Sequence, residues 1–222
     1  MTEPHKIASA SVRQGIADLT KRRFTPAIDI TMTTSTDNRD SYLSRMLHLA
    51  GSRLLIADFT NNNVKVMDMQ TNSLVSQISV PGRPWDICHL PVDQVAVTMA
   101  NKGIQFLKTR GQLAIGDPIK VDGDCRGIAY HEDTLIVSFY NGKLAVLNMN
   151  GHVIRQIERD GSGKELFNWP AYLVVVGEGS TAFIYVSDRR RYTISKLDIA
   201  LNIIKTFQDP ASKVLWHLGT IF

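Results

Sequence analysis

Aromatic and charged side chains lie close together at the start of several strand-like segments. The segments begin Pro84-Trp85-Asp86, Cys125-Arg126-Gly127, Pro170-Ala171-Tyr172 and Leu215-Trp216-His217. Aromatic rings beside a guanidinium group could stack on a nucleic-acid base or grip a peptide. The predicted binding residues here are Trp85, Asp86, Arg126, Tyr172, Trp216 and His217. A purely structural alternative stays open, in which the rings pack in a core and Arg126 pairs with a carboxylate such as Asp124.

The densest basic run is Arg189-Arg190-Arg191, which follows Ser187-Asp188 and is expected on a turn between two strands. Three arginines on one turn could contact the phosphates of RNA. The alternative is a solvated turn that also protects a sheet edge. We include Arg189, Arg190 and Arg191 among the candidate binding residues.

No set of residues with catalytic spacing stands out. Asp58 and Asp188 end two similar strands, but Met99 and Phe139 take the same place in two others, so we expect these carboxylates to cap backbone N–H groups of the next turn. His131-Glu132-Asp133 is expected on a hairpin turn. We predict no catalytic residue, metal ligand or cofactor. A calcium-dependent hydrolase would need several carboxylates converging on one axis, and it remains a remote alternative.

Cys88 and Cys125 are expected to be small buried groups. Arg126 beside Cys125 could lower the pKa of that thiol if the two side chains meet. Two cysteines cannot form a disulfide framework, which favours a reducing, cytoplasmic location.

One strand recurs four times, at intervals of 41, 40 and 49 residues, as Leu55–Asp58, Ala96–Met99, Ile136–Phe139 and Tyr185–Asp188. Each copy is preceded by an inner strand and followed by a polar turn, such as Asn141-Gly142, and two further strands. Asn-Gly favours a tight hairpin because both central residues tolerate positive φ. A period near 40 with four strands per unit is typical of β-propeller blades.

We therefore predict an all-β fold in which residues 24–222 form a partial β-propeller of four-stranded antiparallel blades, about four blades and part of another. Phe24–Thr34 is expected to be a strand, and residues 1–23 a leader or short helix. The uneven blade count leads us to expect that the chain is a fragment of a larger ring.

The net charge of +4 is concentrated at one end of the chain. Residues 1–24 contain five Lys or Arg and two Asp or Glu, which leaves the rest nearly neutral. A nucleic-acid-binding surface would therefore need local clustering of basic residues. No apolar run is long enough to cross a membrane, so we expect no membrane association.

The unit Leu54-Leu55-Ile56-Ala57-Asp58-Phe59, with Asn61, Asn63 and the strand that follows, resembles the NHL type of propeller repeat. Arg83–Ile87, Asp124–Tyr130 and Leu147–Gly151 look more specifically like the C-terminal propellers of molluscan tripartite-motif-like proteins. That resemblance implies a six-bladed ring behind a RING finger, B-boxes and a coiled coil. The two cysteines and six histidines here cannot supply a RING or B-box.

We accordingly expect a non-enzymatic recognition module that binds a protein partner or ubiquitination substrate, as the propeller part of a tripartite-motif-like ubiquitin ligase. Single-stranded RNA binding is the alternative. No small-molecule substrate is expected.

Overall fold

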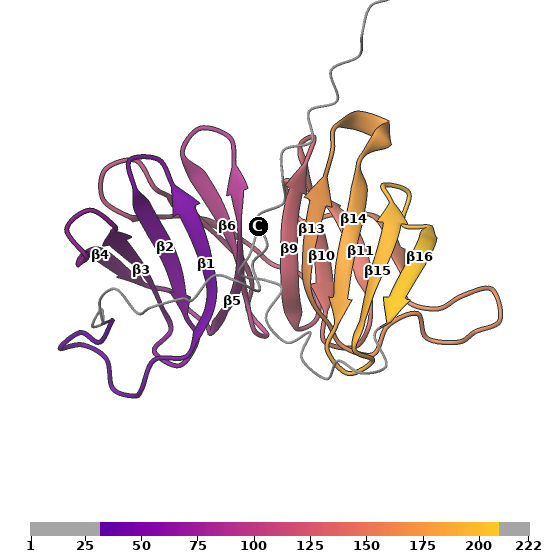
Figure 1. Ribbon diagram of the computed structural model, residues 1–222, viewed down its shortest axis with the longest axis horizontal. Coiled ribbons are helices and arrows are strands. Elements are labelled where there is room, and N and C mark those ends of the chain that lie inside the picture. Colours follow the sequence, from indigo (N-terminus) through magenta and orange to yellow (C-terminus); the bar gives the residue numbers. More distant parts are fainter. Residues whose placement is uncertain (1–31, 209–222) are drawn as a thin grey trace, which may run out of the picture. The chain divides into compact units, whose positions relative to one another are not determined.

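The computed structural model describes residues 32–208, and sixteen strands and one short 3-10 helix lie within them (Figure 1). The strands form four sheets of four. Their bounds are β1 Leu43–Leu49, β2 Arg53–Asp58, β3 Asn63–Asp68 and β4 Ser73–Ser79; β5 Pro84–Leu90, β6 Gln94–Met99, β7 Gly103–Lys108 and β8 Ala114–Ile119; β9 Cys125–His131, β10 Thr134–Phe139, β11 Leu144–Asn148 and β12 Val153–Ile157; β13 Pro170–Val176, β14 Phe183–Asp188, β15 Thr193–Asp198 and β16 Ile203–Gln208. The helix is η2, Gly179–Thr181.

Each sheet is built from consecutive antiparallel strands in sequence order. The first strand of each sheet is the inner one, and β1, β5, β9 and β13 lie beside one another in succession. This arrangement is a β-propeller of four blades, which confirms the predicted all-β architecture (Figure 1). No helix of the described part of the chain is long and apolar enough to cross a bilayer.

Every inner strand has a register shift near its start, between Leu43 and Arg45, Pro84 and Ile87, Cys125 and Ile128, and Pro170 and Tyr172. A β-bulge redirects side chains, which is why bulges are common beside binding sites. In two blades a hydroxyl on the neighbouring strand occupies the bulge: Thr98 Oγ1 accepts the N–H of Asp86, and Ser138 Oγ accepts that of Gly127. The bulges therefore set the directions of the first inner-strand side chains.

Apolar side chains fill the space between successive blades. Leu55 and Val66 of the first blade pack with Ile87 and Val97 of the second. The second and third blades share a cluster around Leu135, and the third and fourth share one around Ile184. Because each strand alternates its side chains between two faces, one repeated sequence can bury both faces of an internal blade.

The predicted turns are confirmed within residues 32–208. Asn62 adopts φ 53° between β2 and β3, and Gly142 adopts φ 93° between β10 and β11. Glu132 and Asp133 form the β9–β10 hairpin turn with φ of 43° and 56°. Asp58 and Asp188 accept backbone N–H groups from the turns that follow them, as expected.

The strand expected over Phe24–Thr34 lies mostly outside the described residues, and its last part, Met32–Thr34, is not a strand. Thr34 forms a turn instead: its N–H donates to Asp37 Oδ2 at 2.8 Å, and its carbonyl accepts the N–H of Asp37 at 3.0 Å. Both backbone groups are therefore unavailable to a neighbouring strand. The boundary predicted at residue 24 and the inner strand at Trp216-His217 also lie outside the described residues.

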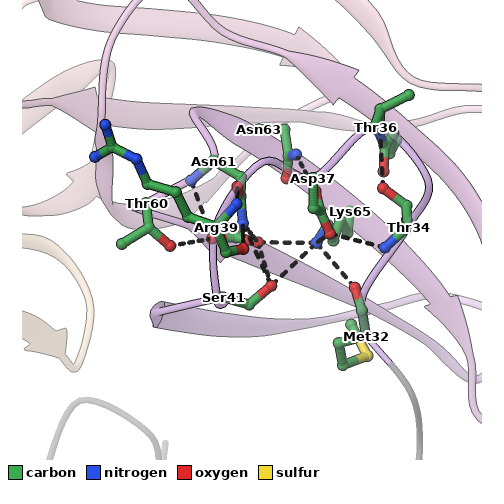
Figure 2. Close-up of polar contacts among 12 residues, drawn as sticks. Met32, Thr34, Thr36, Asp37, Arg39, Ser41, Thr60, Asn61, Asn63 and Lys65 are labelled. Atoms are coloured by element: carbon green, nitrogen blue, oxygen red, sulfur yellow. Dashed lines mark hydrogen bonds and ion pairs between the residues drawn. The ribbon is translucent and has the colours of Figure 1, made fainter.

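A buried ion cluster fixes residues 32–41 to the first blade (Figure 2). The Lys65 ammonium lies 2.7 Å from Asp37 Oδ2 and 2.8 Å from Asp58 Oδ2, and all three side chains are fully buried. Lys65 also donates to the carbonyl of Met32 at 2.8 Å. Burial raises the pKa of Asp58, but hydrogen bonds from Lys65, Asn61 and Ser41 outweigh it and hold that pKa at about 2.

Candidate binding site

Because the inner strands run in the same direction, they all begin at one end of the blades, which we call the proximal face. Three predicted residues from three blades meet there. Trp85 of β5 stacks on Tyr172 of β13, with ring centroids 5.9 Å apart. The guanidinium carbon of Arg126, from β9, lies 4.5 Å from the centroid of the Trp85 ring. The structure thus brings together residues that are up to 87 positions apart in the sequence.

Several further rings, which were not predicted from the sequence, extend this group. Phe59 meets Trp85 edge-on at 5.7 Å, and Trp169 lies 6.1 Å from Trp85. Tyr140 contacts Trp169 at 5.4 Å, and Tyr42 contacts Phe59 at 5.8 Å. Together with four arginines they form what we call the aromatic–arginine cluster: Tyr42, Phe59, Trp85, Tyr140, Trp169, Tyr172, Arg83, Arg126, Arg189 and Arg190.

The missed residues obey the repeat, and this signal could have revealed them. In three blades a cluster residue makes the same backbone contact: the residue that follows the second strand donates its N–H to the carbonyl of the residue that precedes the inner strand. Phe59 donates to Tyr42 at 2.9 Å, and Arg189 donates to Trp169 at 2.8 Å. Tyr140 donates to Asp124 in the same way at 2.9 Å. Aligning these turn positions along with the strands would have placed them on the proximal face.

Arg126 is the buried centre of the cluster. Its guanidinium group contacts Trp85 and Tyr140, with its carbon 5.2 Å from the Tyr140 ring. Nη2 donates to Asp124 Oδ2 at 2.5 Å, which confirms the carboxylate pairing considered from the sequence. Burial lowers the pKa of Arg126 while Asp124 opposes that shift, and an arginine stays charged at neutral pH. Its Nε and Nη1 groups are buried and have no hydrogen-bond partner among residues 32–208.

Two residues of the basic run complete the cluster from the turn between β14 and β15. Arg189 stacks on Trp169, with its guanidinium carbon 4.7 Å from the ring centroid. Arg190 lies over both Tyr140 and Trp169, at 5.5 and 5.6 Å, and its Nη2 donates to the Tyr140 hydroxyl at 2.9 Å. Arg190 and Tyr140 are both exposed.

Arg191 serves a different role. Its Nη1 donates to the carbonyl of Leu166 at 2.6 Å, and its Nη2 to that of Glu165 at 2.9 Å. These bonds hold the long connection between β12 and β13 against the β14–β15 turn. Arg191 therefore positions the backbone next to Trp169.

Asp86 is not part of the aromatic–arginine cluster. It is fully buried where three blades meet. It pairs with Arg45 of β1 at 3.1 Å and accepts the backbone N–H groups of Ile87 and Ile128. Burial raises the pKa of Asp86 to about 6, although Arg45 and the two N–H groups act in the opposite direction. The remaining predicted site residues, Trp216 and His217, lie outside residues 32–208.

Cys125 is a small buried group, as expected, and the lowering effect of Arg126 on the pKa of its thiol is outweighed. Cys125 is fully buried, and burial together with the nearby Asp124 raises the pKa of the thiol to about 12. Burial likewise raises the pKa of Cys88. Within the described residues, no group of three or more His, Cys, Asp or Glu side chains is arranged to hold a metal ion.

Solved structures with the same fold were found by structural comparison. Virginiamycin B lyase from Staphylococcus aureus aligns with a TM-score of 0.58 and 14% identity, over 79% of this chain and 58% of that one. The β-propeller domain of Myceliophteria thermophila Cps50 (Swd1) aligns at 0.57 and 13%, over 75% and 58%. BBS1N, solved in complex with ARL6DN, aligns at 0.56 and 13%, over 78% and 57%.

These identities are low, so the likenesses establish the β-propeller fold alone. The chain spans just under three fifths of the length of each of these three structures. Neither a protein-family model nor a curated protein matches the chain by sequence. The NHL type and the tripartite-motif-like relationship therefore stay predictions.

Proposed function

We propose that this propeller is a non-catalytic recognition module that binds a protein partner through the aromatic–arginine cluster on its proximal face. The observation that carries the proposal is the position of Arg126, which stacks on Trp85 and has two buried donors without a partner in the described part of the chain. Trp, Tyr and Arg are the residues that most often dominate the energy of protein–protein binding. The cluster combines all three, drawn from all four blades.

The chemistry of the cluster favours binding over catalysis. Its polar groups are guanidinium, indole and phenol groups. Guanidinium and indole groups do not titrate near neutral pH, so they cannot act as general acids or bases there. Tyr172 is the least exposed of the three tyrosines in the cluster, and burial raises the pKa of its hydroxyl. Such groups hold a ligand by stacking and by donating hydrogen bonds.

A similar structure offers a precedent for a protein partner, because BBS1N was solved in complex with ARL6DN. The predicted likeness to tripartite-motif-like proteins suggests a more specific setting. In that setting the partner is a ubiquitination substrate, and a RING supplied elsewhere recruits the conjugating enzyme. We propose this setting as the context of the module.

Single-stranded RNA is the second candidate ligand. It is favoured by the exposed guanidinium groups of Arg83 and Arg190 beside the exposed ring of Tyr140. Arginine and aromatic side chains together bind phosphates and bases without strong sequence preference. The near-neutral charge of residues 25–222 weighs against it.

The test is a comparative affinity purification of the full chain from cell extract, with and without ribonuclease. The bait variants are Tyr140→Ala with Arg190→Ala, which alter exposed side chains of the cluster, and Arg110→Ala, an exposed control on the opposite face. We expect specific proteins to be lost with the double variant and retained with the control, in both extracts. Loss of all captured proteins on ribonuclease treatment would instead support RNA. Equal recovery by all three baits would contradict a function for the cluster.

A further inference from the structure

Arg126 has hydrogen-bonding capacity that the protein itself does not use. Its side chain is only 10% exposed, and Nη2 is its one bonded nitrogen within the described residues. The indole Nε1 of Trp169 is also buried, and no residue between 32 and 208 accepts a hydrogen bond from it. A buried donor without an acceptor has lost its hydrogen bonds to water without replacing them, which is unfavourable. Asp124 Oδ1, an acceptor beside Arg126, is likewise buried without a partner within the described residues. Three unpartnered nitrogens against one unpartnered oxygen indicate that a ligand at this place supplies mainly acceptors.

The charge of the cluster indicates what kind of acceptor this is. Guanidinium groups already lie over the rings of Trp85, Tyr140 and Trp169, and their positive charge disfavours a cationic ligand at the same rings. Asp124 pairs with Arg126, whereas no carboxylate of residues 32–208 forms an ion pair with Arg83 or Arg190, which lie over aromatic rings. The nearby carboxylate of Asp188 is occupied by backbone N–H groups and Arg191. The cluster is therefore positively charged and favours an anion.

Two anions could supply the acceptor, and the rings distinguish them. RNA binding of this kind depends on bases that stack on open ring faces. Trp85 is only 5% exposed, and Tyr172 and Arg126 cover it. A carboxylate needs no open ring, because it binds through its oxygens to guanidinium and indole N–H groups in one plane. The arrangement favours a carboxylate.

We propose that the site bounded by Arg126, Tyr140 and Trp169 binds a carboxylate of an acidic peptide, with Arg126 and Trp169 as its hydrogen-bond donors. This inference rests on the proposed function, since it names the chemical group of the partner that the same face would recognise. The carboxylate is either an Asp or Glu side chain or the carboxyl end of a chain.

The way into the site is over Tyr140. Its ring lies against Arg126, and its hydroxyl is held by Arg190 at 2.9 Å. Both residues are exposed, and exposed side chains change rotamer within nanoseconds. An incoming carboxylate that draws Arg190 away from Tyr140 frees this ring to move and uncovers the buried guanidinium group.

The indole N–H signals of the full chain provide a direct test by NMR. Trp169 Nε1 has no hydrogen-bond partner within the described residues, whereas Trp85 Nε1 donates to the carbonyl of Ala171 at 2.9 Å and is an internal control. N-acetylglycine represents a chain end, the α-amide of N-acetylaspartate represents a side chain, and N-acetylglycinamide is the uncharged control. One carboxylate gives at best millimolar affinity, so each probe is titrated to about 50 mM at constant ionic strength.

We expect a saturable shift of the Trp169 signal with one or both acids and none with the amide. The acid that binds more tightly identifies the source of the carboxylate. Arg126→Gln should abolish the shift and Arg110→Gln should retain it; Trp169→Phe assigns the signal should Arg126→Gln fail to fold. An unmoved Trp169 signal, or a shift with inorganic phosphate and not with the acids, would overturn the proposal.

The same acids, added to the affinity purification, separate this proposal from the proposed function. Proteins that depend on Tyr140 and Arg190 should be released by the binding acid and not by its amide. If they stay bound with acid present, recognition by the cluster stands and the carboxylate proposal fails. If no protein depends on the two residues, the proposed function fails, whatever the NMR result.

Discussion

Trp85 and Arg126 occupy the same position of the repeat in adjacent blades and stack on each other across the blade boundary. The residue before each, Pro84 or Cys125, pairs with the last residue of the neighbouring strand. Both then lie in the bulge of their inner strand, and the guanidinium carbon lies 4.5 Å from the indole centroid. The repeat thus places Trp85 and Arg126 at equivalent positions of adjacent blades. They can stack because one side chain is aromatic and the other is cationic.

Trp85 is expected to stabilise the propeller as well as shape the cluster. It is buried against Phe59, Trp169 and Tyr172, and its Nε1 donates to Ala171. Trp85→Ala should lower the free energy of unfolding by about 3–5 kcal/mol, as measured by urea denaturation. Trp85→Phe should cost less, because it keeps a ring and loses mainly the hydrogen bond. Equal losses for the two variants would show that ring packing contributes little.

Removing the charge of Lys65 from its buried ion cluster is expected to destabilise the protein strongly. Lys65→Met leaves the buried carboxylates of Asp37 and Asp58 without their cation, and should cost about 3–5 kcal/mol of unfolding free energy at pH 7. Adding Asp37→Asn and Asp58→Asn should recover most of this loss, because no buried charge then remains unpaired. If the triple variant is no more stable than Lys65→Met, the hydrogen bonds, and not the charges, dominate.

The raised pKa of Asp86 leads us to expect that the free energy of unfolding falls as the pH rises from 4 to 6. Its pKa is raised to about 6 in the folded protein from a usual value of 3.8. In that window the folded state holds a proton that the unfolded state has released, so the free energy of unfolding falls as pH rises, by on the order of 3 kcal/mol in total. Asp86→Asn should lack this component. The difference between wild-type and variant denaturation curves across the window is the measurement, and a pH-independent difference would contradict a raised pKa.

Gly127 marks the close approach of two inner strands. A Cβ atom there would lie 2.9 Å from the backbone nitrogen of Leu173 and from the Cα atom of Tyr172. Gly127→Ala should therefore force β9 and β13 apart and lower the unfolding free energy by about 1–3 kcal/mol. Gly161→Ala is the matched control, because a Cβ there meets nothing within 4 Å. Similar denaturation midpoints for the two variants would contradict this packing.

Much of the fold could be predicted from the sequence because its signals are local. Alternating apolar residues, Asn-Gly turns and the spacing of Leu55–Asp58 and its copies each lie within one blade. The same repeat located Trp85, Arg126 and Tyr172 on one face. It did not reveal Tyr140 and Trp169, since these lie in turns, where no side-chain alternation marks a position.

The sequence by itself determined the kind of blade, the order of its strands and the face on which the inner strands begin. Only the tertiary structure decided which residues meet there. Arg126 could have been a solvated charge, but the bulge in β9 turns it onto Trp85. Lys65 and Asp37 are 28 positions apart and pair only because residues 32–41 fold against β3. The repeated pattern reflects the local requirements of each blade. Contacts between blades depend instead on how the blades pack, because packing brings together side chains that are distant in the sequence.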